Sequence, residues 1–118
     1  MQKNTGISRL IYASLYSWLG FKSALINESA FRQEFIASLL LTAFSFFLDV
    51  SAYERLAMIA SLALVLIIEL LNSAIECVVD RVGTEQHILS GRAKDYGSFA
   101  VLISLLIAIA IWTVIILN

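Results

Sequence analysis

The chain has 118 residues, enough for one domain, of which 60% are hydrophobic and only 14% are charged. Soluble domains are roughly half apolar and a quarter charged, so this composition favours a protein embedded in lipid. The net charge of −1 gives no basic excess for nucleic acid, and a single cysteine and a single histidine exclude a disulfide scaffold and a zinc finger.

The first predicted element covers residues 7–26 and is an amphipathic helix, because at 100° per residue its apolar and polar side chains separate onto opposite faces. We expect this helix to lie on the membrane surface. The alternative, a signal peptide, would be apolar all round and would end in a small-residue cleavage site. The apolar face holds Ile7, Leu10, Ile11, Leu15, Trp18, Phe21 and Leu25, and the opposite face holds Arg9, Tyr12, Tyr16, Ser23 and Asn27.

Three apolar segments follow, and each is predicted to cross a bilayer as a helix, which takes about 20 residues. They are residues 29–48, 53–80 and 95–117. The chain contains no proline, which favours long uninterrupted helices. The predicted fold is therefore an all-α integral membrane domain over 1–118, with a surface helix at 1–27 and three transmembrane helices.

The positive charges predict the orientation of these helices, because lysine and arginine concentrate on the cytoplasmic side. With three membrane-spanning helices, Arg55 is the one lysine or arginine on one side of the membrane, and the other seven are on the opposite side. We therefore expect the N-terminus and the 81–94 segment to be cytoplasmic and the C-terminus to lie outside. The residues on the cytoplasmic side are Lys3, Arg9, Lys22, Arg32, Arg81, Arg92 and Lys94.

The second predicted span carries a polar stripe in its C-terminal half. Glu69, Asn72, Ser73, Glu76 and Asp80 all fall within about 60° of Glu69 on a helical wheel. An acidic group at the bilayer centre costs at least ~2.5 kcal/mol, so the stripe is expected to face a partner, a cation or a substrate. The alternative is that it only joins helices, through hydrogen bonds and protonated or paired carboxylates.

Further polar clusters stand at the start of the first and third predicted spans. Glu28 and Glu76, with Lys94 and Arg9 nearby, are suitable for a hard cation and a phosphate group, because Mg²⁺ prefers oxygen ligands and commonly shares phosphate oxygens. Each of these residues also has a simpler interpretation. Glu28 alone could be a solvated charge at the membrane interface, and Lys94 alone could be a positive anchor on the cytoplasmic side. No P-loop or protein-kinase motif is present.

Three segments of the chain, in this order, resemble the signature segments of the prokaryotic diacylglycerol kinase family. They are residues 26–34 (INESAFRQE), 69–81 (ELLNSAIECVVDR) and 89–98 (LSGRAKDYGS). The resemblance extends over roughly residues 6–117 and is closest to the Gram-negative members; Ile88 stands where the family carries an acidic residue.

This resemblance implies a homotrimeric enzyme of the bacterial inner membrane, with active sites shared between subunits. With Mg²⁺ it would transfer the γ-phosphate of ATP to the primary hydroxyl of diacylglycerol, giving phosphatidic acid. Glu69 would be the general base, Asn72 would order the catalytic face, and Glu28 and Glu76 would hold the metal.

The resemblance also implies two sets of contacts. The nucleotide would meet Arg9, Tyr16, Glu28, Glu76, Glu85, Gln86, His87, Lys94 and Asp95. The lipid would meet Ala13, Ser14, Leu15, Tyr16, Ser17, Trp18, Ala30, Phe31, Arg32, Gln33, Glu34, Phe47, Leu48, Asp49, Val50, Glu69 and Ser98.

Three other functions remain open on the residues alone. The first is an undecaprenol kinase, the activity of Gram-positive relatives, which would use the same groups. The second is a small proton-coupled transporter with Glu69 as the proton carrier. The third is a structural subunit, which would tolerate Glu76→Gln.

Overall fold

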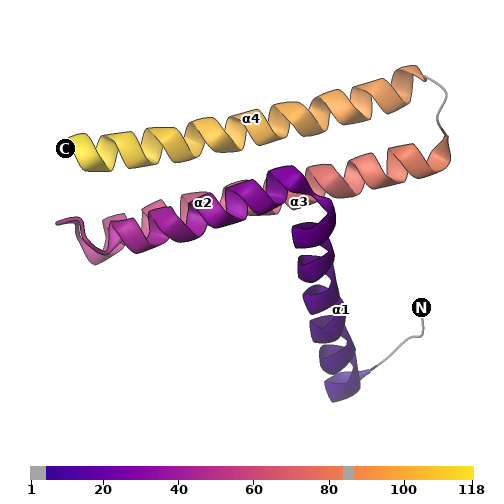
Figure 1. Ribbon diagram of the computed structural model, residues 1–118, viewed down its shortest axis with the longest axis horizontal. Coiled ribbons are helices and arrows are strands. Elements are labelled where there is room, and N and C mark those ends of the chain that lie inside the picture. Colours follow the sequence, from indigo (N-terminus) through magenta and orange to yellow (C-terminus); the bar gives the residue numbers. More distant parts are fainter. Residues whose placement is uncertain (1–4, 84–86) are drawn as a thin grey trace.

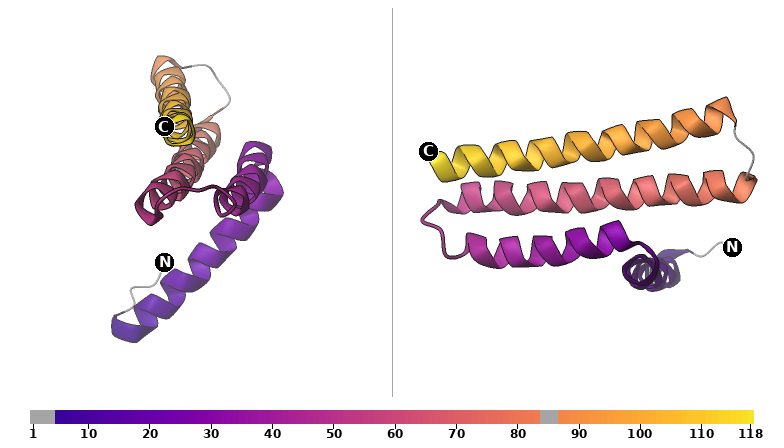
Figure 2. Two further views of the ribbon diagram at one scale, coloured as in Figure 1. Left: turned by 90° about the vertical axis from the view of Figure 1, so that its left-hand side faces the viewer. Right: turned by 45° about the horizontal axis from the view of Figure 1, so that its top comes forward.

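The computed structural model describes residues 5–83 and 87–118, and every regular element in these residues is an α-helix. The helices are α1 (Gly6–Asn27), α2 (Ser29–Ser45), α3 (Ala52–Val82) and α4 (Ile88–Leu117). Figure 1 shows α2, α3 and α4 running alongside one another in alternating directions, whereas α1 projects away from them. Figure 2 shows α3 between α2 and α4, and the α3–α4 interface is the most extensive of the helix contacts.

The helices α3 and α4 are long and apolar enough to cross a membrane, and the predicted spans 53–80 and 95–117 lie within them. Helix α2 has 17 residues and stops at Ser45, before the predicted end of the first span. Residues 46–48 instead form a turn. The all-α class is thus confirmed in the described residues, with two helices that satisfy the length and apolarity of a span.

The turn after α2 is held by Arg55 of α3. Its guanidinium donates to the carbonyls of Ser45 (3.1 Å) and Leu48 (3.1 Å) and lies 5.2 Å from the centre of the Phe46 ring. A helix leaves its last carbonyl groups without intrahelical partners, so these bonds stabilise the end of α2 and the turn that follows. They explain why the helix ends before the apolar sequence does.

The start of α3 is fixed by a capping box. The Ser51 hydroxyl accepts from the Glu54 backbone N–H (3.1 Å), and the Glu54 carboxylate accepts from the Ser51 backbone N–H (2.8 Å). This reciprocal pair satisfies two donors that a helix start would otherwise leave free.

A sharp elbow joins α1 to α2 at Glu28, which has an extended backbone (φ −111°, ψ 101°). Arg32, one turn into α2, donates to the carbonyls of Leu25 (2.8 Å) and Ile26 (3.3 Å) at the end of α1. A cluster of three aromatic rings packs beside the elbow: Phe21 lies edge-on to Phe31 and Phe35, with centroids 6.3 and 5.1 Å away. The elbow therefore holds Glu28 in a defined place at the start of α2.

The protein core is small and lies mainly along α3. Phe31 on α2 and Met58 on α3 are fully buried, and Leu62, Val65 and Ala108 are also buried. Most large apolar side chains on all four helices are instead exposed. Exposed apolar surface on this scale indicates contact with lipid or with other subunits.

Candidate active site

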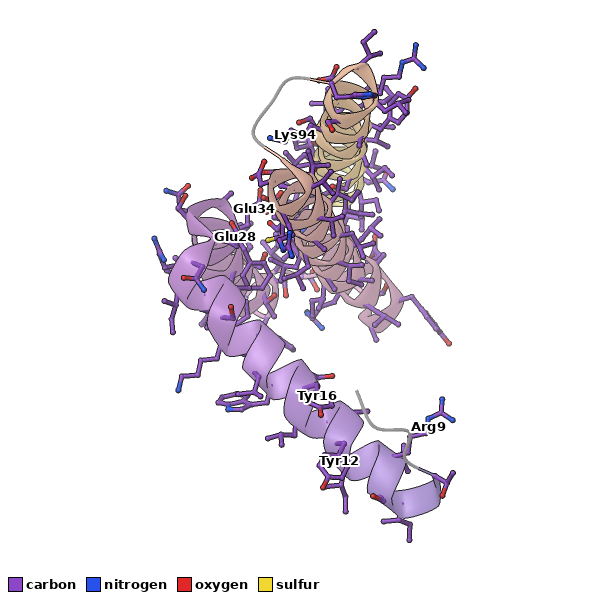
Figure 3. All side chains as sticks on the ribbon, turned by 90° about the vertical axis from the view of Figure 1, so that its right-hand side faces the viewer. Arg9, Tyr12, Tyr16, Glu28, Glu34 and Lys94 are labelled. Carbon is purple, nitrogen blue, oxygen red and sulfur yellow. The ribbon has the colours of Figure 1, made fainter. Side chains whose placement is uncertain are left out.

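Polar side chains from three helices lie toward the end of the bundle where α3 leads to α4. Figure 1 shows that the α1–α2 elbow lies beside the C-terminal half of α3, which continues past the elbow to this end. Figure 3 looks at the molecule from this end and labels Glu28, Glu34 and Lys94, with α1 extending away. The polar stripe predicted on the second span belongs to the half of α3 that reaches this end.

Four carboxylates make up the acidic cluster of the site: Glu28 at the elbow, Glu34 on α2, and Glu69 and Glu76 on α3. Glu69 is only 7% exposed, and it lies close enough to Glu76 and Glu28 for their charges to interact. Glu34 interacts in the same way with Glu69. None of the four forms an ion pair with a residue that the structure describes. A cluster of this kind suits a cation or the hydroxyl group of a substrate.

Asn72 lies between Glu69 and Glu76 in the sequence of α3 and contacts Glu76. Its side-chain N–H donates to Glu76 Oε1 at 3.0 Å, and one helical turn toward the middle of the bundle lies Glu69. The Asn72 Oδ1 atom is buried and has no hydrogen-bond partner among the described residues. The amide therefore orients the Glu76 carboxylate while its other end packs between helices.

The positive charge of the site comes from α4. Lys94 Nζ lies 2.9 Å from Asp80 Oδ1, so this ion pair connects α4 to the end of α3. The hydrogen bond to Asp80, followed by the negative charge of Asp80, raises the pKa of Lys94 above its ordinary value. Lys94 therefore stays protonated at neutral pH, and its side chain is 46% exposed, so a phosphate group can reach it.

The sequence predicts Asp80 as a member of the polar stripe, but its pairing with Lys94 was not predicted. A usable signal was present: Asp80 and Lys94 are equidistant from His87 in the sequence. In two antiparallel helices joined by a short connection, such residues come to lie opposite each other.

The predicted contacts on α1 do not lie near this cluster within one copy of the chain. Arg9 is about 28 Å from Glu28 along the helix axis, and Figure 3 shows Arg9 and Tyr16 far out on α1. The Tyr12 and Tyr16 rings stack, with centroids 6.4 Å apart, on the polar face that the sequence predicted. The predicted lipid contacts Ala13, Ser14, Leu15, Tyr16, Ser17 and Trp18 are all exposed.

The predicted lipid contacts in the α2–α3 turn lie at the opposite end of the bundle. The start of α3 at Ala52 is about 26 Å from Glu69 along the helix, and Figure 1 shows the turn at the same end of the bundle as the C-terminus. These contacts are Phe47, Leu48, Asp49 and Val50.

The remaining predicted residues have varied surroundings. Arg32 caps α1, and Phe31 is buried in the aromatic cluster, whereas Ala30 and Gln33 are exposed. His87 caps α4, because its Nδ1 accepts from the Leu89 backbone N–H at 3.1 Å. Asp95 and Ser98 are exposed on α4, and Glu85 and Gln86 lie outside the described residues.

The described residues do not contain a complete metal cage: in 5–83 and 87–118, no group of three or more His, Cys, Asp or Glu side chains could hold a metal ion by itself. Glu28 and Glu76 still fit Mg²⁺, because this ion is commonly bound by one or two carboxylates together with substrate phosphates and water. The arrangement thus supports binding of a metal together with a phosphate compound.

The family model for prokaryotic diacylglycerol kinase matches residues 15–116. The chain belongs to the prokaryotic diacylglycerol kinase family. A diacylglycerol kinase of Escherichia coli (strain K12) is 54% identical over 110 residues, which cover 93% of this chain and 90% of the relative. The one from Haemophilus influenzae is 51% identical over 112 residues (95% of each chain), and the one from Pseudomonas aeruginosa is 48% identical over 114 residues (97% and 93%).

Membership of the diacylglycerol kinase family confirms the resemblance seen in the sequence and favours an enzyme over a transporter or a structural subunit. The whole cluster at the end of the bundle lies within the matched residues, whereas Arg9, Ala13 and Ser14 precede them.

Proposed function

We propose that this protein is an ATP-dependent diacylglycerol kinase, which transfers the γ-phosphate of ATP to the primary hydroxyl of diacylglycerol and gives phosphatidic acid. Its support is the 54% identity to a named diacylglycerol kinase over 93% of the chain. The observation that carries the mechanism is the buried Glu69 on the same helix as Glu76, with Lys94 held at the end of α3.

The two carboxylates of α3 serve different substrates. Glu69 lies about 10.5 Å deeper along the helix than Glu76, so it meets a hydroxyl that enters from the lipid side, whereas Glu76 meets a nucleotide that enters from water. Glu69 accepts the proton of the lipid hydroxyl, and the hydroxyl oxygen attacks the γ-phosphorus as ADP leaves. Phosphoryl transfer depends on positioning and charge neutralisation more than on covalent chemistry, so a P-loop is not required.

The residues near water bind the nucleotide. Glu28 and Glu76 would hold Mg²⁺, which when bound would neutralise charge on the phosphate oxygens. Asn72 keeps the Glu76 carboxylate oriented, and Lys94 contacts the phosphate chain from α4. The other predicted nucleotide contacts would complete this set: Arg9, Tyr16, Glu85, Gln86, His87 and Asp95.

We further propose a homotrimer in the bacterial inner membrane, with the N-terminus cytoplasmic and the C-terminus periplasmic. In one copy, Arg9 on α1 and the α2–α3 turn lie far from the carboxylates, and most large apolar side chains are exposed. Neighbouring subunits would bring these parts to a shared site and cover part of that surface. Helix α2, with 17 residues, is at the short end of the range for a third membrane-spanning helix.

The decisive experiment is ATP-dependent phosphorylation in mixed micelles that contain diacylglycerol and undecaprenol side by side. We expect phosphatidic acid from the wild type and its loss in Glu69→Gln and in Glu76→Gln. Glu54→Gln is the matched control, because it is the same change at the far end of α3, where glutamine also completes a capping box.

Three outcomes would contradict the proposal in different ways. Phosphorylated undecaprenol instead of phosphatidic acid would preserve the chemistry and change the substrate. An unchanged rate in Glu69→Gln would remove the general base from the mechanism. The absence of product from both lipids would reject the kinase.

A further inference from the structure

The carbonyl end of Asn72 is held against α4 at one residue, Gly97. Gly97 is buried, and a Cβ atom built on it would collide with Asn72 Oδ1 and lie 3.1 Å from Asn72 Cγ. The amide of Asn72 therefore occupies the space that any side chain at position 97 would need. Gly97 is the one glycine on α4 with such a contact, because a Cβ on Gly91, two turns earlier, would meet nothing within 4 Å.

This contact limits the positions that the Asn72 amide can take. Its N–H donates to Glu76 Oε1 at 3.0 Å, and its buried Oδ1 has no hydrogen-bond partner among the described residues. No hydrogen bond thus fixes the oxygen end, and the backbone of α4 at Gly97 confines it by shape. A side chain at 97 would push the amide away or separate α3 from α4, and either change would release Glu76.

We propose that Gly97 is a positioning residue for the nucleotide–metal site, which acts by leaving room for the Asn72 amide to hold the Glu76 carboxylate. This role rests on the proposed function, in which Glu76 binds the metal. Gly97 itself does not touch substrate; its effect passes through Asn72. Loss of a group that orients a metal ligand typically weakens metal binding or activity 10- to 100-fold.

The test is a double-mutant cycle with Gly97→Ala, Asn72→Ala and the double variant, and with Gly91→Ala as the matched control. The Asn72 Cβ atom would lie 3.7 Å from a Cβ at 97, which is ordinary van der Waals contact, so alanine fits at both positions together. The double variant therefore removes the collision and keeps the helices packed.

Two readouts distinguish positioning from a general loss of structure. We expect Gly97→Ala to raise the KM for MgATP about tenfold or more, with the KM for diacylglycerol unchanged, and to weaken binding of Mn²⁺ with a non-hydrolysable ATP analogue by a similar factor. The double variant should be no worse than Asn72→Ala, because residues that act through one contact are not additive. Gly91→Ala should match the wild type.

The unfolding midpoint in detergent provides a measurement that needs no kinase activity. Alanine is ordinarily favoured over glycine inside a helix, so Gly91→Ala should keep or raise the midpoint, Gly97→Ala should lower it, and adding Asn72→Ala should restore it. Additive losses in the double variant, or a Gly97→Ala protein that behaves like Gly91→Ala, would overturn the proposal. If the wild type does not phosphorylate diacylglycerol, the proposed function is rejected. The unfolding midpoints of the three variants would then still test the steric contact between Gly97 and Asn72.

Discussion

Exchanging the two charges of the Asp80–Lys94 pair, by Asp80→Lys with Lys94→Asp, tests whether Lys94 contacts the nucleotide. The pair spans 2.9 Å, and its side chains are 46% and 67% exposed, so solvent screens the attraction and the pair contributes little to stability. The exchange keeps opposite charges on α3 and α4 and should leave the unfolding midpoint unchanged. It attaches the lysine to α3 instead of α4, so the ammonium group no longer takes the position from which Lys94 is proposed to contact the phosphate chain.

The expected cost of the exchange is therefore in catalysis. Removing one preorganised group that stabilises charge in the transition state costs about 100- to 1000-fold in kcat. Initial rates in mixed micelles at saturating diacylglycerol, together with detergent unfolding of the same samples, measure both effects. Asp80→Asn, which leaves the lysine in place without its anchor, should lose less activity than the exchange. Wild-type kcat/KM in the exchanged protein would show that the pair is only structural and would refute this role of Lys94.

Two further predictions concern the α3–α4 interface. The pKa of Lys94 is raised in the folded state, so the stabilisation from its pairing with Asp80 is fully present below about 10.5, its ordinary pKa, and is lost as pH rises through the higher folded value. Unfolding midpoints of the wild type and Asp80→Asn should therefore differ only slightly at pH 7, and this small difference should disappear toward pH 11. A difference that grew with pH would contradict the assignment. Trp112 Nε1 donates to the buried Met58 carbonyl at 3.0 Å, and a hydrogen bond between membrane helices contributes about 0.6 kcal/mol, up to ~1.7. Trp112→Phe should lower the free energy of unfolding by at least that amount, whereas Trp18→Phe, at a residue 60% exposed, should have a smaller effect; equal losses would argue against the bond.

The amino-acid sequence predicted the helices well because their signals are local. Apolar runs without proline located α3 and α4, and the wheel of the second span placed Glu69, Asn72 and Glu76 on one face. The Asn72–Glu76 hydrogen bond confirms that face for the last two residues. Local periodicity is sufficient here because residues three and four apart on a helix are neighbours whatever the rest of the fold does.

The features that were not predicted depend on distant partners. The end of α2 at Ser45 is set by Arg55, ten residues later in the chain. The role of Arg32 as a cap for α1 depends on the elbow at Glu28, which no periodic pattern reveals. The contact of Gly97 with Asn72 likewise depends on the register between two helices.

Three contacts along the α3–α4 pair define that register. Met58 meets Trp112 at one end, Asn72 packs on Gly97 in the polar half, and Asp80 pairs with Lys94 near the connection. The members of each pair lie at nearly equal distances in sequence from the α3–α4 connection, so all three contacts specify one alignment of antiparallel helices.

This alignment sets the depth of the carboxylates relative to the positive charge. Because α3 and α4 are held at both ends and at Gly97, Glu69 and Glu76 keep fixed heights relative to Lys94. Glu28 reaches the cluster from another direction, at an elbow held by Arg32. In the proposed mechanism, the α3–α4 hairpin would thus supply the base, one metal ligand and the phosphate contact, while the second metal ligand would come from the elbow. Substitutions of Arg32 should therefore weaken binding of the metal nucleotide more than they disturb the packing of α3 against α4.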